Sequence, residues 1–169
     1  MKNHFRLFRY FAYSLEILVL FLLQQTPNFI PSLWGIKPTL LIPVALSIAL
    51  FEKELAAMGF GVACGLLIDF GHGDVIGFHA ILLAICCYAI SALVTNLFKT
   101  NLLTAVLMGL ASIFLIFFFQ WVFFYVFPNY GQAGYALVRH YFPRMAYTAA
   151  ILPITYYFNR AFAIFLRER

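Results

Sequence analysis

The segment GFGVACGLLIDFGHGDVIGFHAILLAICCY, residues 59–88, decides the fold, because two apolar stretches meet there at a short glycine-rich turn. Before the turn, small residues and one acid recur at every fourth position: Ala57, Gly61, Gly65 and Asp69. In a helix this spacing places all four on one face. Small residues at this spacing let a second helix approach closely, the mode of association favoured in lipid. After the turn the spacing recurs in Ala80, Ala84, Tyr88 and Ala92. We therefore predict a helical hairpin with smooth inner faces and a polar tip, in which Asp69 faces protein.

The composition is that of an integral membrane protein. Of 169 residues, 64% are hydrophobic, 20% aromatic and only 10% charged, and the mean hydropathy is +0.93. A soluble domain carries about 25% charged residues, so the polar surface here is too small to cover a globule in water. The apolar runs are continuous and exceed the alternating segments of about ten residues that build a membrane barrel. We expect one all-α transmembrane domain over residues 1–169.

The apolar runs predict a bundle of six transmembrane helices. The predicted spans are residues 10–26, 36–51, 54–70, 75–98, 101–127 and 143–166. The second is short, since a 30 Å hydrocarbon core takes about 20 residues. It must borrow flanking residues, be tucked among other helices, or thin the bilayer locally. Pro43 and Pro153 are expected to kink their helices. Residues 1–9 are predicted to form a basic interfacial collar, and residues 128–144 a polar loop.

The distribution of cations predicts the orientation. With six spans, eight lysines and arginines would share one side of the membrane: Lys2, Arg6, Arg9, Lys53, Lys99, Arg160, Arg167 and Arg169. Three would lie on the other side: Lys37, Arg139 and Arg144. Positive charge is retained in the cytoplasm, so both termini should be cytoplasmic and the turn at residues 69–77 should face outward. Topology thus explains the net charge of +5, and no basic patch indicates binding of nucleic acid.

Motifs for chemistry are scarce. The chain has no Walker motif, no GxSxG elbow and no HExxH. One polar cluster surrounds the turn: Asp69, His72, Asp74 and His79. Carboxylates and imidazoles are metal ligands, but Asp74 at the start of the following helix also has the ordinary role of capping free amides. We favour the cap, and expect no catalytic residue, no metal and no cofactor.

Other polar side chains lie inside the predicted spans. Glu16 is costly in hydrocarbon, so we expect it to face the bundle or to be protonated. Gln120 is a second candidate for a buried polar group. The three cysteines fall in apolar segments, where we expect small packing residues and no disulfide: Cys64, Cys86 and Cys87.

The turn also carries a family resemblance. Asp69, Gly73 and Gly77 form the motif D-x3-G-x3-G. Further features are Gly61 and Gly65 before the motif, Tyr88 in the helix after it, Pro38 opening the second span and Pro153 within the sixth. Together with the overall length, these features resemble the rod shape-determining protein MreD family over essentially the whole chain. His72 and Asp74 stand inside the motif where neutral residues are expected.

The resemblance implies a non-enzymatic scaffold of the bacterial inner membrane that helps to maintain cell shape by organising lateral peptidoglycan synthesis. It implies an MreC-like single-span partner and, indirectly, MreB-like filaments, a RodA-like polymerase and a penicillin-binding protein. A homo-oligomer is left open. A scaffold should present helix faces to its partner, for which the small-residue stripe and the aromatic fifth span are suited.

A second hypothesis comes from the same resemblance. The family is similar in architecture to the S-components of energy-coupling-factor vitamin transporters, which bind small molecules. Such a subunit needs polar groups that converge on a pocket. The candidates are Glu16, Gln24, Gln25, Asp69 and Gln120, and their spacing in the sequence does not say whether they converge.

Overall fold

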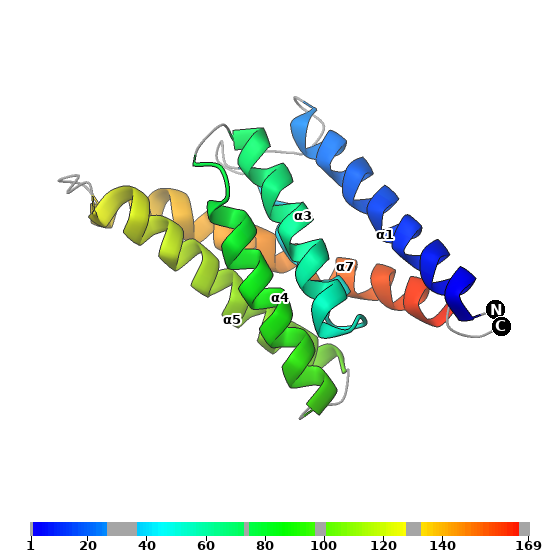
Figure 1. Ribbon diagram of the computed structural model, residues 1–169. Helices are drawn as coiled ribbons and strands as arrows, with labels where there is room; N and C mark the ends of the chain where they lie inside the picture. Colours follow the sequence, from blue (N-terminus) through cyan, green and yellow to red (C-terminus); the bar gives the residue numbers. More distant parts are fainter. Residues whose placement is uncertain (1, 27–36, 73–74, 97–100, 128–132, 166–169) are drawn as a thin grey trace.

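The computed structural model describes residues 2–26, 37–72, 75–96, 101–127 and 133–165, which are helical apart from short connections and contain no strand. The elements are α1 (Lys2–Gln25), α2 (Leu41–Ala49), α3 (Glu54–His72), α4 (Phe78–Asn96), α5 (Leu102–Trp121), η1 (Val122–Val126), α6 (Ala133–Ala136), η2 (Leu137–Tyr141) and α7 (Phe142–Phe165). The π-helical segment η1 continues α5, and α6 with η2 leads into α7 (Figure 1). The predicted all-α class is confirmed for this part of the chain.

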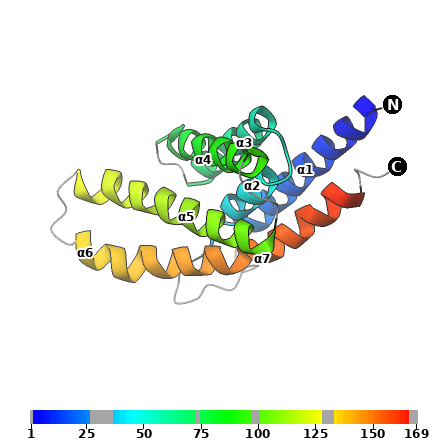
Figure 2. The same cartoon turned by 90° about the horizontal axis from the view of Figure 1, so that it is seen from below.

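Successive segments run in alternating directions, and the start of α1 lies at the same end of the molecule as the end of α7 (Figure 1). Figure 2 shows α5 and α7 side by side, with the hairpin of α3 and α4 on one side of them. Among the described helices, four are long and apolar enough to cross a membrane: Arg6–Gln25, Glu54–Gly71, Phe78–Asn96 and Leu102–Val126. The length of α7, 24 residues, also suffices, but polar residues such as Arg144, Asn159 and Arg160 lower its hydropathy.

Helix α2 corrects the prediction of a second full span over residues 36–51. It has 9 residues and is therefore about 14 Å long, half of what a hydrocarbon core of about 30 Å requires. All of its residues are buried, and it contacts α1, α3, α4, α5 and α7. Of the three arrangements considered for this short segment, it is the one tucked among other helices. Pro43 lies in its first turn, where amides have no partner within the helix, so the predicted kink has no cause.

The hairpin of α3 and α4 is the most extensive contact between helices. A Cβ atom added to Gly65 would lie 2.3 Å from the Cα atom of Ala80, and one added to Gly61 would lie 2.8 Å from the carbonyl oxygen of Leu83. The two backbones therefore touch along the stripe that ends at Asp69. The predicted stripe on α4 is wrong beyond Ala80, because Tyr88 is 48% exposed. An α-helix turns once per 3.6 residues, so its contact face alternates steps of three and four and passes through Leu83 instead.

Two other boundaries differ from the predicted ones. The basic residues of the collar belong to α1, which begins at Lys2. The loop predicted over residues 128–144 is helical from Ala133 onward. The polar residues of this segment indicated a loop, but the π-helical segment η2 directly precedes α7, which contains Pro143 in its first turn. Proline lacks the amide that a regular turn would use, and an irregular turn before it accommodates that loss.

We predict that Gly65→Ala lowers the free energy of unfolding by about 1–3 kcal/mol, because the new methyl group meets the backbone of α4 and not a movable side chain. Gly59→Ala is the matched control, since nothing lies within 4 Å of its added Cβ. The control should be neutral or stabilise the helix by up to about 1 kcal/mol. Thermal unfolding of both proteins in one detergent, followed by circular dichroism, measures the difference. Equal melting temperatures for the two variants would contradict the close packing.

Candidate functional site

The polar end of the hairpin is organised by Asp69, whose side chain is 0% exposed. Its Oδ2 accepts hydrogen bonds from the backbone amides of Gly77 at 2.8 Å and Ala80 at 3.5 Å. Its Oδ1 accepts from the amide of His79 at 3.2 Å, and the Nδ1 atom of His79 lies 2.7 Å from the same oxygen. One carboxyl group at the end of α3 thus meets several polar groups at the start of α4.

This geometry gives Asp69 the role of a cap. The first amides of a helix have no partner within it, and a carboxylate beside them satisfies these amides and interacts favourably with the helix dipole. The sequence suggested Asp74 for this role, but Asp74 and Gly73 lie outside the described residues. Gly77 has a φ angle of +97°, in the left-handed region that side chains resist, so the turn requires glycine there.

Of the four polar residues of the turn, the structure describes the side chains of Asp69 and His79. Asp69 and His79 are in contact, and His72 is the last residue of α3. No group of three or more histidine, cysteine, aspartate or glutamate side chains that could hold a metal is found among the described residues. What the geometry provides is a buried connection between α3 and α4.

A second buried polar group joins α1, α2 and α7. Asn159 Nδ2 donates hydrogen bonds to Ser47 Oγ at 2.8 Å, to Glu16 Oε1 at 3.2 Å and to the carbonyl oxygen of Thr155 at 3.1 Å. Glu16 is buried and so faces the interior of the bundle. Sequence analysis missed Asn159 and Ser47, although an asparagine inside an apolar span was an available signal.

The start of α2 is held by side chains of α1 and α7. Gln24 Oε1 accepts a hydrogen bond from the amide of Leu40 at 3.0 Å, and Thr148 Oγ1 accepts one from the amide of Thr39 at 3.3 Å. The guanidinium of Arg144 donates to Thr39 Oγ1 at 3.0 Å. These bonds fix the segment that enters the bundle interior, directly after the buried Pro38.

The candidate polar residues therefore belong to separate contacts. Glu16 meets Asn159, Gln24 meets the start of α2, and Asp69 meets the start of α4. Gln120 is buried on α5, whereas Gln25 is exposed. The hydrogen bonds of the described residues do not bring these five side chains into one polar pocket. Pro153 lies inside α7, as the sequence indicated.

At the opposite end of the hairpin, an ion pair joins α1 to the connection between α2 and α3. Arg9 Nη2 donates to Glu52 Oε2 at 2.9 Å, and Arg9 Nε contacts Glu52 Oε1. Burial raises the pKa of the Glu52 carboxyl, and the charge of Arg9 opposes that rise. Ser91 Oγ of α4 donates to the backbone oxygen of Glu52 at 2.6 Å. This connection is thereby attached to two further helices.

These contacts define the class of the molecule: a multi-pass α-helical membrane protein whose buried polar side chains fasten helices to one another. The chain belongs to the MreD family, because it matches rod shape-determining protein MreD over residues 5–166, nearly its whole length. The family acts in determining rod shape and is associated with the MreC/MreB shape complex. No curated protein and no solved structure matches the chain.

Replacing Asp69 should destabilise the hairpin, and the loss should be larger when more of the carboxylate oxygens that accept hydrogen bonds are removed. We predict that Asp69→Ala lowers the free energy of unfolding by about 2–4 kcal/mol, because the amides at the start of α4 stay buried without a partner. Asp69→Asn keeps one acceptor oxygen and should lose about half as much. Thermal unfolding gives the order of stability, and hydrogen exchange at residues 77–80 should accelerate in the same order. Wild-type exchange in Asp69→Ala would refute the capping role.

The hydrogen bonds of Asn159 should contribute less to the free energy of unfolding than the cap does, because hydrogen bonds between membrane helices contribute little to stability where they have been measured. We predict that Asn159→Ala costs about 1–2 kcal/mol of stability. Asn96→Ala is the matched control: Asn96 is exposed and bonds the carbonyl oxygen of Ala92 within its own helix, so its loss should cost at most about 0.5 kcal/mol. The melting temperatures of both variants, compared in one detergent, test this. A larger effect at Asn96 would contradict the assignment.

Proposed function

We propose that this protein is a non-enzymatic scaffold of the cell-elongation complex in the bacterial inner membrane, with both termini in the cytoplasm. The match to the MreD family over residues 5–166 is the observation that carries the proposal. In this role it binds an MreC-like single-span protein and, through it, MreB-like filaments, a RodA-like polymerase and a penicillin-binding protein. It thereby helps to organise lateral peptidoglycan synthesis.

The arrangement of polar groups supports a scaffold. The buried carboxyl, amide and hydroxyl groups at Asp69, Asn159 and Thr148 are used in contacts between helices. The long helices present broad apolar outer faces instead, with many exposed leucine, isoleucine and phenylalanine side chains. A molecule of this kind can bind other membrane helices while its own interior stays fixed. The shared position of the start of α1 and the end of α7 supports placing both termini on one side (Figures 1 and 2).

The surface for the partner helix is restricted by the fold. Helix α4 packs directly on the small-residue stripe with Gly61 and Gly65. This stripe therefore cannot bind a partner helix, which was the use that the sequence suggested for it. The aromatic face of α5 remains, where Phe114 and Phe118 stack at 5.9 Å between ring centroids and are both exposed. Aromatic side chains are enriched in protein interfaces. We place the MreC-like helix on this face.

One cavity among the described residues offers the vitamin-binding alternative no support. That cavity is a groove between α1 and α3 with an apolar lining. The hydroxyl of Ser14 in it already donates to the carbonyl oxygen of Tyr10 at 2.8 Å. A vitamin site needs several polar groups that point at the ligand.

Depletion of the protein in its own bacterium, followed by complementation, tests the proposal. We expect rod-shaped cells to become round on depletion, and affinity purification from native membranes to recover a single-span coiled-coil protein. Phe114→Ala/Phe118→Ala should reduce this recovery and restore rods poorly. The matched control is Ile81→Ala/Ile85→Ala, an exposed pair at the same spacing on α4. Rods that persist after full depletion, or recovery of an ATPase pair with a bound vitamin, would overturn the proposal.

A further inference from the structure

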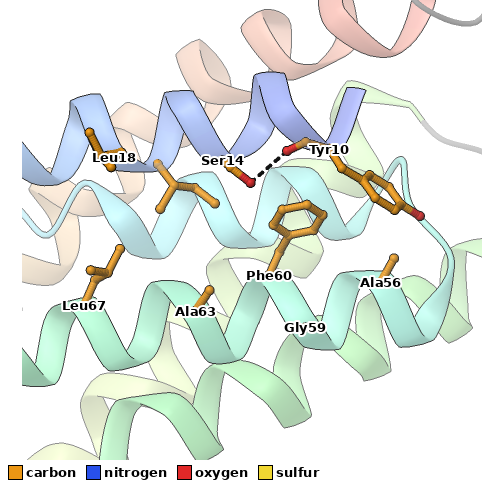
Figure 3. A pocket seen from close by; sticks show the side chains of 9 residues that line it. Tyr10, Ser14, Leu18, Ala56, Gly59, Phe60, Ala63 and Leu67 are labelled. Carbon is orange, nitrogen blue, oxygen red and sulfur yellow. Dashed lines mark hydrogen bonds between the residues drawn. The ribbon is translucent and has the colours of Figure 1, made fainter. Parts of the chain in front are cut away.

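The groove between α1 and α3 is an apolar recess on the outside of the helix bundle. It has a volume of about 380 Å³ and is lined on α1 by Tyr10 to Leu18 and on α3 by Ala56 to Leu67 (Figure 3). Its lining is apolar, so a hydrocarbon chain is a chemically matched occupant.

The floor of the α3 side is made by small residues. Gly59 and Ala63 are exposed and face the groove (Figure 3). Nothing lies within 4 Å of a Cβ atom added to Gly59, whereas Gly61 and Gly65 on another face of α3 are filled by α4. The missing side chain at Gly59 thus creates open apolar space at the membrane-facing surface of the protein.

The length of the groove is close to the thickness of the hydrocarbon region of one leaflet. Tyr10 to Leu18 covers about 12 Å of α1, and Ala56 to Leu67 covers about 16 Å of α3, at 1.5 Å per residue. Half of the hydrocarbon core is about 15 Å thick. A chain lying in the groove would start near Tyr10 and Ala56 at the membrane surface and end near Leu18 and Leu67 towards the middle of the bilayer.

Two cations stand at the surface end of the groove. Arg6 precedes Tyr10 by four residues on α1 and so lies one turn before it on the same face, and Lys53 lies directly before α3, three residues ahead of Ala56. Both are exposed, and neither forms an ion pair within the described part of the chain.

Two acids, Glu52 and Glu54, lie in the same region of the chain. Glu52 is neutralised by Arg9, and Glu54 lies in the first turn of α3, where the helix dipole favours an acid. With Arg6, Arg9 and Lys53 set against Glu52 and Glu54, the net charge at this end of the groove is +1, which would attract an anionic headgroup.

We infer that the groove between α1 and α3 is a binding site for an anionic phospholipid, with one acyl chain between the helices and the phosphate beside Arg6 and Lys53. The lipid comes from the leaflet at the amino-terminal end of α1. This site is separate from the α5 face given to the partner helix, and it stands whether or not that partner assignment holds.

Native mass spectrometry of the purified full chain tests the site with dioleoyl phosphatidylglycerol and dioleoyl phosphatidylcholine, which share their chains and differ in headgroup charge. We expect the first phosphatidylglycerol to bind about 10-fold more tightly than phosphatidylcholine, as two nearby cations can provide. Arg6→Gln/Lys53→Gln should remove most of this preference, while Arg160→Gln, an exposed cation on α7, should retain it.

Side chains that fill the groove should weaken the binding of both lipids. We expect Gly59→Leu, and independently Ala63→Leu, to lower the affinity for the first lipid of either headgroup while the melting temperature without lipid is not lowered. Ala89→Leu on the exposed face of α4 is the matched control and should bind like wild type. Equal affinity of the wild type for the two lipids, wild-type binding by the groove-filling variants, or a partner helix that binds in the groove in place of lipid would overturn the inference.

Discussion

The approach of α3 to α4 sets the geometry on which the rest of the molecule depends. Two backbones can touch at Gly65 only if no side chain separates them, and a Cβ atom there would lie 2.3 Å from Ala80. Because α3 and α4 lie so close together, the start of α4 is buried, and its first backbone amides, which have no partner within the helix, need other acceptors. Asp69, one turn beyond Gly65, supplies them. Glycine and aspartate therefore act together, because the glycine permits the approach and the aspartate satisfies the amides that the approach buries.

The central helix α2 follows from this hairpin. It packs on both α3 and α4 and is closed from the other sides by α1, α5 and α7. A helix of 9 residues cannot cross the bilayer alone, so its ends must find polar partners inside protein. Gln24 and Thr148 meet its start, and Asn159 meets Ser47 within it. The polar groups of the interior fix this arrangement, and the large apolar side chains of the long helices are exposed on the outside.

The sequence predicted the hairpin because its signal is local. The period of four before the turn identifies a helix face, and the glycines identify the turn. The role of α2 was not predictable in this way, since a run of leucine and isoleucine has the same sequence pattern whether the helix faces lipid or is buried in protein. The contacts of Asn159 join residues 112 and 143 positions apart, and no spacing rule links such distant polar residues. The exposed Tyr88 shows the limit of a strict period of four on a helix with 3.6 residues per turn.

Disulfide formation across the hairpin tests the approach of α3 to α4 most directly. A Cβ atom added to Gly61 would lie 3.0 Å from the Sγ atom of Cys87, close enough for a sulfur on it to form a disulfide with the S–S length of about 2.05 Å. With Cys64 and Cys86 replaced by alanine, mild oxidation of native membranes that carry Gly61→Cys should link position 61 to Cys87, as seen by mass spectrometry of the joined peptides. Gly59→Cys in the same background should not link. Failure of Gly61→Cys to link, or equal linking from position 59, would contradict the backbone contact between α3 and α4.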